Sequence, residues 1–374
     1  MPKLSQIFVH PIKSFPGISL DTVALSKGEG LPNDRRFAIT NGISNTMDGA
    51  WLTCRSFFIN AVNEGLLKFS VEMDDDTIRI RSPEGLGLSL RIGDPEGLAI
   101  ANRRLADFVS SLNPSDDMPM PVITERSQMQ GALSGYWDFN DSGISFMNAA
   151  SLKAVSNAMG EDLDIRRLRG NLIIGDLPAW EEFSCIGKSI RIGSNGPELD
   201  ILRPVKRCPA TSVNPETGIR DIKVPVALMD HFGHAFCGIY AKVTKPGQIN
   251  TDETIEVIGD AKTPLVEAAN PADSDYKLWP KQAEVVSHIS SNTGAEITIN
   301  AAGPWPLPDA IVGQRVRFHI GQDLIGVATV HEQRDHSTVL HVEPSETSDP
   351  ATAYLLEKVK AGDRLIVSGP FGRG

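Results

Sequence analysis

The 374-residue sequence lacks several features that mark other classes of protein. Its four cysteines, Cys54, Cys185, Cys208 and Cys237, are widely spaced and include no Cys-x-x-Cys pair, which excludes a zinc ribbon and a plant-type iron–sulfur site. No apolar run reaches the length of a membrane span, and residues 1–4 contain no apolar signal segment. We therefore expect reduced thiols in a soluble, cytoplasmic protein without a membrane partner.

The sequence also lacks an excess of positive charge. It has 36 Lys and Arg residues against 47 Asp and Glu residues, which gives a formal net charge of −11. Binding to nucleic acid without sequence preference requires an extended basic surface, so we expect no nucleic-acid partner. An anionic ligand would have to be held by local groups of cations, which lie at 166–169 and 203–207. The chain length predicts two or three domains with a sizeable core.

Short segments that alternate apolar and polar residues fill the first third of the chain. They predict strands over 4–9, 19–25, 37–40, 66–73, 77–82 and 86–92, and many short strands at this spacing favour a small barrel or sandwich. A first helix is predicted over 98–112, where Asn113 and Pro114 end it. Residues 113–145 predict a linker and a mobile loop, in which Tyr136 and Trp137 are candidates for substrate contact.

The middle of the chain combines a helix with strands that lead to one cysteine. A helix is predicted from 147 to about 159, with Asn148 as its N-cap and as a candidate anion ligand at the same helix end. Arg166 and Arg167 are expected to belong to a generic basic surface. Strands over 188–192 and 199–202 then lead to Cys208.

Cys208 directly follows Lys206 and Arg207, and Arg203 lies five residues upstream. Neighbouring cations stabilise a thiolate, so this pattern predicts a lowered pKa for the Cys208 thiol. Thiolates are ligands for soft or high-valent metal centres. The alternative is a buried structural cysteine, because free cysteines are among the most buried residues.

The last third predicts another β-rich unit. Residues 261–280 have the composition of a linker, and six strands are predicted over 283–289, 295–299, 315–320, 326–331, 338–342 and 364–367, with a short helix over 350–359. Four histidines in this unit are expected to be solvated rather than metal-bound: His319, His331, His336 and His341. His231 and His234 lack a third ligand nearby, so zinc is not predicted.

Two motifs carry a resemblance to a known family. Arg203-Pro204-x-x-Arg207-Cys208, followed by Thr211-x-Val213-Asn214-Pro215-x-Thr217-Gly218, resembles the signature of the MOSC domain, named after the C-terminus of molybdenum cofactor sulfurase. Pro11-Ile12-Lys13-Ser14-Phe15-x-Gly17 and Asp34-Arg35-Arg36-Phe37 resemble its N-terminal β-barrel partner domain. The motifs occur in the family's order, and the resemblance covers roughly residues 1–260.

The resemblance implies a mainly β fold with some α. It predicts a MOSC N-terminal β-barrel domain over 1–115, a MOSC β-barrel over 116–260 and a linker over 261–280. Residues 281–374 resemble the flavin-binding barrel of ferredoxin reductases. The Arg-x-Tyr-Ser flavin signature is absent near 326–329, and no nicotinamide-binding domain follows, so FAD is not expected and this barrel is predicted to be a docking module.

The resemblance also implies a function. Reductases of N-hydroxylated compounds, which include the amidoxime-reducing components, bind the molybdenum cofactor, and the thiolate matching Cys208 binds molybdenum. The implied substrate is a small N-hydroxylated compound, and electrons would come from an external reductase or ferredoxin. Pyridoxal phosphate binding is a further family-level expectation. Cys237 and the pattern at 180–183 are expected to be scaffold. The positions implied to contact the cofactor are Lys13, Ser14, Arg35, Arg55, Asn148, Arg169, Asn171, Lys206, Arg207 and Tyr240.

Two alternatives remain open from the sequence. A sulfur carrier or cofactor-handling protein would hold a persulfide on Cys208 and pass sulfur to a molybdenum centre, a role that also suits a reactive thiol. A structural adaptor would require Cys208 to be buried and unreactive. Retention of tightly bound metal and pterin separates the enzyme from the carrier.

Overall fold

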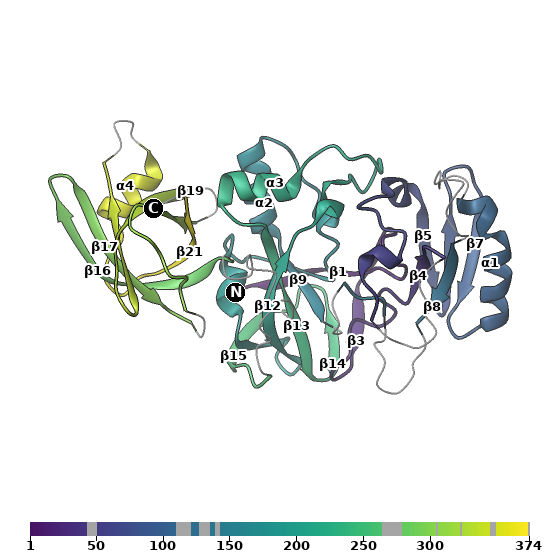
Figure 1. The fold of residues 1–374 in the computed structure, drawn as a ribbon. Coiled ribbons are helices and arrows are strands. Elements are labelled where there is room, and N and C mark those ends of the chain that lie inside the picture. Colours follow the sequence, from purple (N-terminus) through teal and green to yellow (C-terminus); the bar gives the residue numbers. More distant parts are fainter. Residues whose placement is uncertain are drawn as a thin grey trace.

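The computed structural model describes residues 1–42, 51–109, 121–126, 135–138, 143–263, 279–303, 306–321, 324–344 and 349–372. Figure 1 shows three units along the molecule, with the first two sharing strands and the third formed by the end of the chain. The fold is mainly β with some α, as the sequence predicts. No helix in the described residues is long and apolar enough to cross a membrane.

The central unit is an eight-stranded sheet in the order β15-β11-β12-β13-β9-β10-β1-β2. Its strands are β1 (Lys3–Val9), β2 (Ile18–Leu20), β9 (Ile144–Asn148), β10 (Leu172–Gly175), β11 (Lys188–Ile192), β12 (Glu198–Lys206), β13 (Phe236–Lys245) and β15 (Ile255–Asp260). Neighbours are antiparallel except β9 and β10, which are parallel. β3 (Thr22–Leu25) pairs with β14 (Gly247–Asn250). The start of the chain therefore completes the second unit, so the sheet pairing does not follow the predicted boundary at 115.

The N-terminal unit contains two small sheets. β4 (Phe37–Thr40) pairs with β8 (Val122–Glu125), and β5 (Ser70–Asp74), β6 (Thr77–Arg81) and β7 (Gly87–Arg91) form a three-stranded sheet beside helix α1 (Pro95–Val109). The strand predicted over 66–73 is wrong in its first part, which is the 3₁₀ turn η2 (Glu64–Lys68). Leu66 and Leu67 are both buried there, which a strand with one buried face does not allow.

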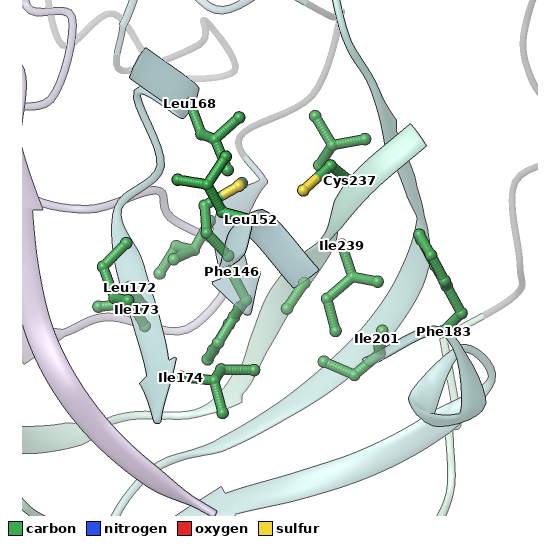
Figure 2. Close-up of a cluster of buried hydrophobic side chains, with 14 of the residues drawn as sticks. Phe146, Leu152, Leu168, Leu172, Ile173, Ile174, Phe183, Ile201, Cys237 and Ile239 are labelled. Atoms are coloured by element: carbon green, nitrogen blue, oxygen red, sulfur yellow. The ribbon is translucent and has the colours of Figure 1, made fainter. Parts of the chain in front are cut away.

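A core of buried hydrophobic side chains lies between the central sheet and helix α2 (Ala149–Met159), and it holds this helix against the sheet (Figure 2). Asn148 caps this helix by accepting a hydrogen bond from the Ala150 amide, and Gly160 ends it in the left-handed conformation. Cys237 is buried in the same core, so its predicted structural role is confirmed. A further short helix, α3 (Val224–Ala227), precedes β13.

The C-terminal unit is a closed six-stranded barrel in the order β16-β17-β20-β19-β18-β21. All six predicted strands are present, and the predicted helix is α4 (Pro350–Glu357), capped by Asp349. Phe318 and Ile297 lie in the barrel core. The strands are β16 (Lys281–Ser291), β17 (Gly294–Ala301), β18 (Arg315–Ile320), β19 (Leu324–Gln333), β20 (Ser337–Val342) and β21 (Arg364–Phe371).

The barrel packs against the central unit through a cluster of aromatic and histidine rings. His319 lies 5.6 Å from Trp180, 6.2 Å from Phe232 and 5.5 Å from His234 between ring centroids. His319 is only 5% exposed, so the expectation that it is solvated is wrong. β18 turns this residue toward the neighbouring unit, which sequence periodicity within the barrel could not reveal. Among the other barrel histidines, His331 and His336 are exposed and His341 is half-buried.

Candidate functional site

A cavity of ≈ 220 Å³ lies between the N-terminal segments and the Cys208 segment. Nine residues predicted from the sequence line it: Lys13, Ser14, Arg35, Arg169, Asn171, Lys206, Arg207, Cys208 and Tyr240. These residues span more than 220 positions of the chain. The central sheet brings them together because it joins β1 and β2, from the start of the chain, to later strands such as β12 and β13. Arg55 and Asn148 do not line the cavity.

The backbone after β12 presents the Cys208 thiol. The Arg207 amide donates to Ala235 O at 2.7 Å, and the Cys208 carbonyl accepts from the Thr211 amide at 3.1 Å and the Thr211 hydroxyl at 2.9 Å. Cys208 thus precedes the 3₁₀ turn η6 (Pro209–Ser212) in a fixed position. It is the exposed cysteine of the four, which contradicts the buried structural alternative.

The predicted lowering of the Cys208 pKa is wrong. Although the residue is exposed, partial loss of solvent around its thiol, together with the negative charge of Asp138, raises the pKa of the thiol. Arg207 does not face the thiol, because its guanidinium donates at 2.7 Å to both Cys237 O and Leu168 O. The charges of Arg207 and Lys13 lower the pKa of the thiol, but burial and Asp138 outweigh them.

Another part of the cavity lining is cationic and has an unusual backbone. Ser14, Arg35 and Arg169 have φ values of 70°, 52° and 51°, in the left-handed region that residues other than glycine rarely adopt. Such conformations cost free energy and are retained where the surrounding structure fixes them, often at binding sites. Here they turn three predicted site residues toward one cavity.

Arg35 and Arg169 form a pair of like charges. Arg35 Nη2 donates to Arg169 O at 3.1 Å, Arg35 Nη1 bonds Asp34, and Arg169 Nη1 donates to Phe15 O at 2.7 Å. Arg169 Nη2 is buried without a hydrogen-bond partner. Burial and the charge of Arg35 lower the pKa of Arg169 to about 10. An unpaired guanidinium nitrogen beside a second cation fits an anionic group such as a phosphate.

Asp138 is a site residue that sequence reasoning missed. Its Oδ1 lies 2.5 Å from Lys13 Nζ and accepts from the Cys54 thiol at 3.4 Å. Burial alone would raise the pKa of Asp138, but Lys13 and Arg35 outweigh it and hold that pKa well below its usual range. No motif surrounds Asp138 in the sequence, so the fold was needed to find it. Burial and Asp138 also raise the pKa of Cys54 to about 12.

The two aromatic candidates beside Asp138 differ. Trp137 lines the cavity, and the Arg35 guanidinium lies 5.9 Å from its ring centroid. Tyr136 instead packs its ring against Phe57 at 5.2 Å, and its carbonyl accepts from Lys13 Nζ at 3.0 Å. Tyr136 therefore positions Lys13 rather than facing the cavity.

The prediction that Arg167 belongs to a generic basic surface is wrong, because this residue is only 3% exposed. Its Nη1 and Nη2 donate to the two Asp221 carboxylate oxygens at 2.8 and 2.7 Å. Arg167 also lines the cavity. The pairing connects η4 (Ile165–Leu168) to the loop that follows Cys208.

Three predicted cofactor contacts have other roles. The Asn148 amide donates to Pro178 O at 2.8 Å and to Glu182 Oε2 at 2.9 Å, so its side chain is used within the core. Asn171 lines the cavity, but its Oδ1 accepts from the Ser145 hydroxyl at 2.8 Å and joins β9 to β10. Arg55 is exposed in the 3₁₀ turn η1 (Cys54–Ser56).

The site can supply one sulfur ligand and several anion ligands. Within the described residues, no group of three or more His, Cys, Asp and Glu side chains is arranged to hold a metal ion alone. A metal held here would need ligands from a bound group, with Cys208 as the protein's sulfur. The cavity thus combines a sulfur ligand with cations that suit an anionic group.

The comparisons with known proteins agree with this kind of site. Residues 1–111 match the model of the MOSC N-terminal beta barrel domain, and residues 134–256 match the model of the MOSC domain. The chain therefore carries both domains and belongs to the MOSC proteins. Together the two matches cover more than half of the chain.

Two curated relatives are mitochondrial. The chain is 24% identical over 299 residues to the mitochondrial amidoxime-reducing component 1 of Mus musculus, covering 68% of this chain and 82% of the relative. It is 23% identical over 292 residues to the mitochondrial amidoxime reducing component 2 of Bos taurus, covering 67% and 82%.

Solved structures with similarity include the YUAD protein of Bacillus subtilis, at 15% identity and a TM-score of 0.35, covering 70% of this chain and 98% of that one. The Amycolatopsis cytochrome P450 reductase GcoB has 14% identity and a TM-score of 0.23, covering 52% and 48%.

Proposed function

We propose that the chain binds the molybdenum cofactor in this cavity and reduces small N-hydroxylated compounds. The observation that carries the proposal is the exposed Cys208 thiol in the same cavity as Arg35 and Arg169, within a MOSC domain. The names of the two mitochondrial relatives, amidoxime-reducing components, support the substrate class and the direction of the reaction. The cofactor is a pterin that carries molybdenum and a phosphate.

The residues would hold the cofactor at its two ends. Cys208 supplies the sulfur ligand, and Arg169, Arg35 and Ser14 supply donors and charge for the phosphate. When bound, the cofactor supplies the two-electron redox chemistry. The Cys208 thiol must lose its proton to become a ligand, and a bound cation would offset the burial that raises its pKa.

The remaining cavity residues would bind substrate and handle protons. Reduction of an N-hydroxylated compound to the amine and water consumes two electrons and two protons. Lys13 Nζ and the Cys54 thiol both donate to Asp138, whose half-exposed carboxylate would connect the buried Lys13 to solvent for proton transfer. Trp137 offers an apolar wall for the substrate.

We propose that the electrons come from a separate reductase or ferredoxin. The word component in the relatives' names is consistent with a multi-protein system. The C-terminal barrel would dock that partner, and without the Arg-x-Tyr-Ser signature it would do so without FAD. Visible absorbance bands that persist through desalting would contradict this part of the proposal. The family matches and the relatives do not support pyridoxal phosphate binding.

The test is metal and pterin analysis of the protein produced with molybdate available. We expect near-stoichiometric molybdenum in the parent, little in Cys208→Ser, and unchanged content in the matched control Cys185→Ser, because Cys185 lies outside the cavity. Reduction of hydroxylamines by the loaded parent would follow. A parent without molybdenum, or a Cys208→Ser variant that retains it, would contradict the proposal.

A sulfur carrier is the second candidate, and the exposure of Cys208 favours it, because a persulfide must reach an acceptor. If the chain is a sulfur carrier, neither the parent nor the Cys208→Ser variant would contain molybdenum. Mass spectrometry of the parent would show one additional sulfur on Cys208, which dithiothreitol would remove. A cysteine without a persulfide, in protein loaded with pterin, would eliminate the carrier.

A further inference from the structure

A small cavity of ≈ 20 Å³ lies in the C-terminal barrel beside the start of β16. Its walls are mostly apolar and include Ile299, Val316 and Val367, together with Trp279 and Lys281. A water molecule requires about 10–15 Å³ in this measure, so the cavity accommodates about one or two atoms of that size. It is separate from the cofactor cavity, and the two share no lining residue.

Lys281 points into the barrel because of its place in β16. Side chains two residues apart lie on the same face of a strand, and Ala283 and Val285 are 0% and 1% exposed in the barrel core. Lys281 is itself 5% exposed. Its Nζ donates to Trp279 O at 3.4 Å and lies 4.7 Å from the centroid of the Trp279 ring. Because Trp279 lines the same cavity, the amine lies at the wall that these two residues form.

The surroundings keep this amine largely neutral just above pH 7. Burial lowers the pKa of Lys281 to about 7, because a charged ammonium group loses its hydration there. No acidic residue is among the described residues that line the cavity. The two hydroxyls of the lining are used elsewhere, since Thr338 donates to Gln333 Oε1 and Ser368 donates to Phe232 O, each at 3.0 Å. A neutral lysine in an apolar pocket is a nucleophile towards a carbonyl carbon.

We propose that Lys281 is a site of covalent modification by aldehydes of one or two carbon atoms, which form an imine inside the barrel. The amine attacks the carbonyl carbon, and a C=N bond forms. Both hydrogens of the neutral amine leave with the carbonyl oxygen as water, so the step needs no oxidant or reductant. The one or two carbon atoms that remain on Nζ match the space in the cavity, whereas a larger aldehyde would have to displace its apolar walls.

The experiment is reductive alkylation of the full chain with acetaldehyde and cyanoborohydride at pH 7.5, followed by peptide mass spectrometry. Cyanoborohydride traps the imine as a secondary amine. A pKa near 7 leaves most of the amine neutral at this pH, whereas an ordinary lysine, with a pKa of about 10.4, is neutral in about one molecule per thousand. We therefore expect ethylation at Lys281 to be at least about tenfold faster than at the internal reference Lys153, whose side chain is 62% exposed. With benzaldehyde, which is too large for the cavity, this preference should disappear.

Variants separate a reaction in the cavity from one at a reactive surface amine. Ala310→Leu fills the cavity from its wall and should slow ethylation of Lys281 at least about tenfold, whereas the matched control Ala353→Leu, at an exposed position of α4, should behave like the parent. Cys208→Ser should also behave like the parent, so the result is independent of the proposed function. Circular dichroism checks that each variant folds. Ethylation of Lys281 no faster than that of Lys153, the same preference with benzaldehyde, or full ethylation in folded Ala310→Leu would each contradict the proposal.

Discussion

The histidine pair beneath the C-terminal barrel should make the folded chain sensitive to acid. His319 Nε2 lies 2.9 Å from the Ser368 hydroxyl, which itself donates to Phe232 O at 3.0 Å. Because the Ser368 hydrogen is committed, His319 must donate through Nε2, which leaves its Nδ1 buried without a partner. Burial and Arg317 lower the pKa of His319 to about 3. Burial and His319 lower that of His234 in the same direction.

The sign and size of the effect follow from proton binding. An unfolded histidine titrates near pH 6.5, so between pH 6.5 and about pH 3 the unfolded chain holds a proton at His319 that the folded chain does not. The contribution to stability is therefore complete above pH 6.5 and is lost as the pH falls. At pH 5 the loss is about 2 kcal/mol for His319 alone.

The assay is urea unfolding followed by tryptophan fluorescence at pH 8 and pH 5, since Trp180 and Trp279 lie at this interface. The change in unfolding free energy between the two pH values should be about 2 kcal/mol smaller in His319→Gln than in the parent. The matched control His336→Gln, at an exposed position, should behave like the parent. Equal pH dependence in His319→Gln and the parent would refute the reasoning.

Three further predictions concern the cofactor cavity and its support. Glu182→Leu removes the acceptor for several buried donors, so it should lower the unfolding free energy by about 3–5 kcal/mol in the same urea assay. The control Lys188→Gln breaks an exposed ion pair and should lower the unfolding free energy by less than about 1 kcal/mol. Arg169→Gln should lower pterin retention about tenfold, measured by fluorescence after desalting, without loss of fold. Asp138→Asn should speed alkylation of Cys208 by iodoacetamide at pH 8 severalfold, measured by mass spectrometry, because it removes a charge that raises the thiol pKa.

Local patterns predicted the strands of the C-terminal barrel well. Each barrel strand pairs mainly with strands of its own unit, and period-two alternation is enough to find them, as at β18 and β20. The same rule failed at Leu66, where two consecutive leucines are buried in a 3₁₀ turn. It also could not show that β1 joins β10, because pairing across 165 or more residues leaves no local signal.

The site was predictable where a motif fixed the residues together. Lys13, Arg35, Arg169 and Cys208 came from resemblance to a family, and all four line the cavity. Asp138 has no motif and was missed, although it touches Lys13 directly. The sequence could not predict this contact, because an ion pair between residues 125 positions apart depends on the fold alone.

Cations and a carboxylate both act on the Cys208 thiol, and burial together with the carboxylate outweighs the cations. Arg207 is adjacent in the chain but donates into the core, whereas Asp138 is distant in the chain and raises the thiol pKa. The same core bonds connect Cys208 to the barrel interface, because the Arg207 amide donates to Ala235 O, next to His234.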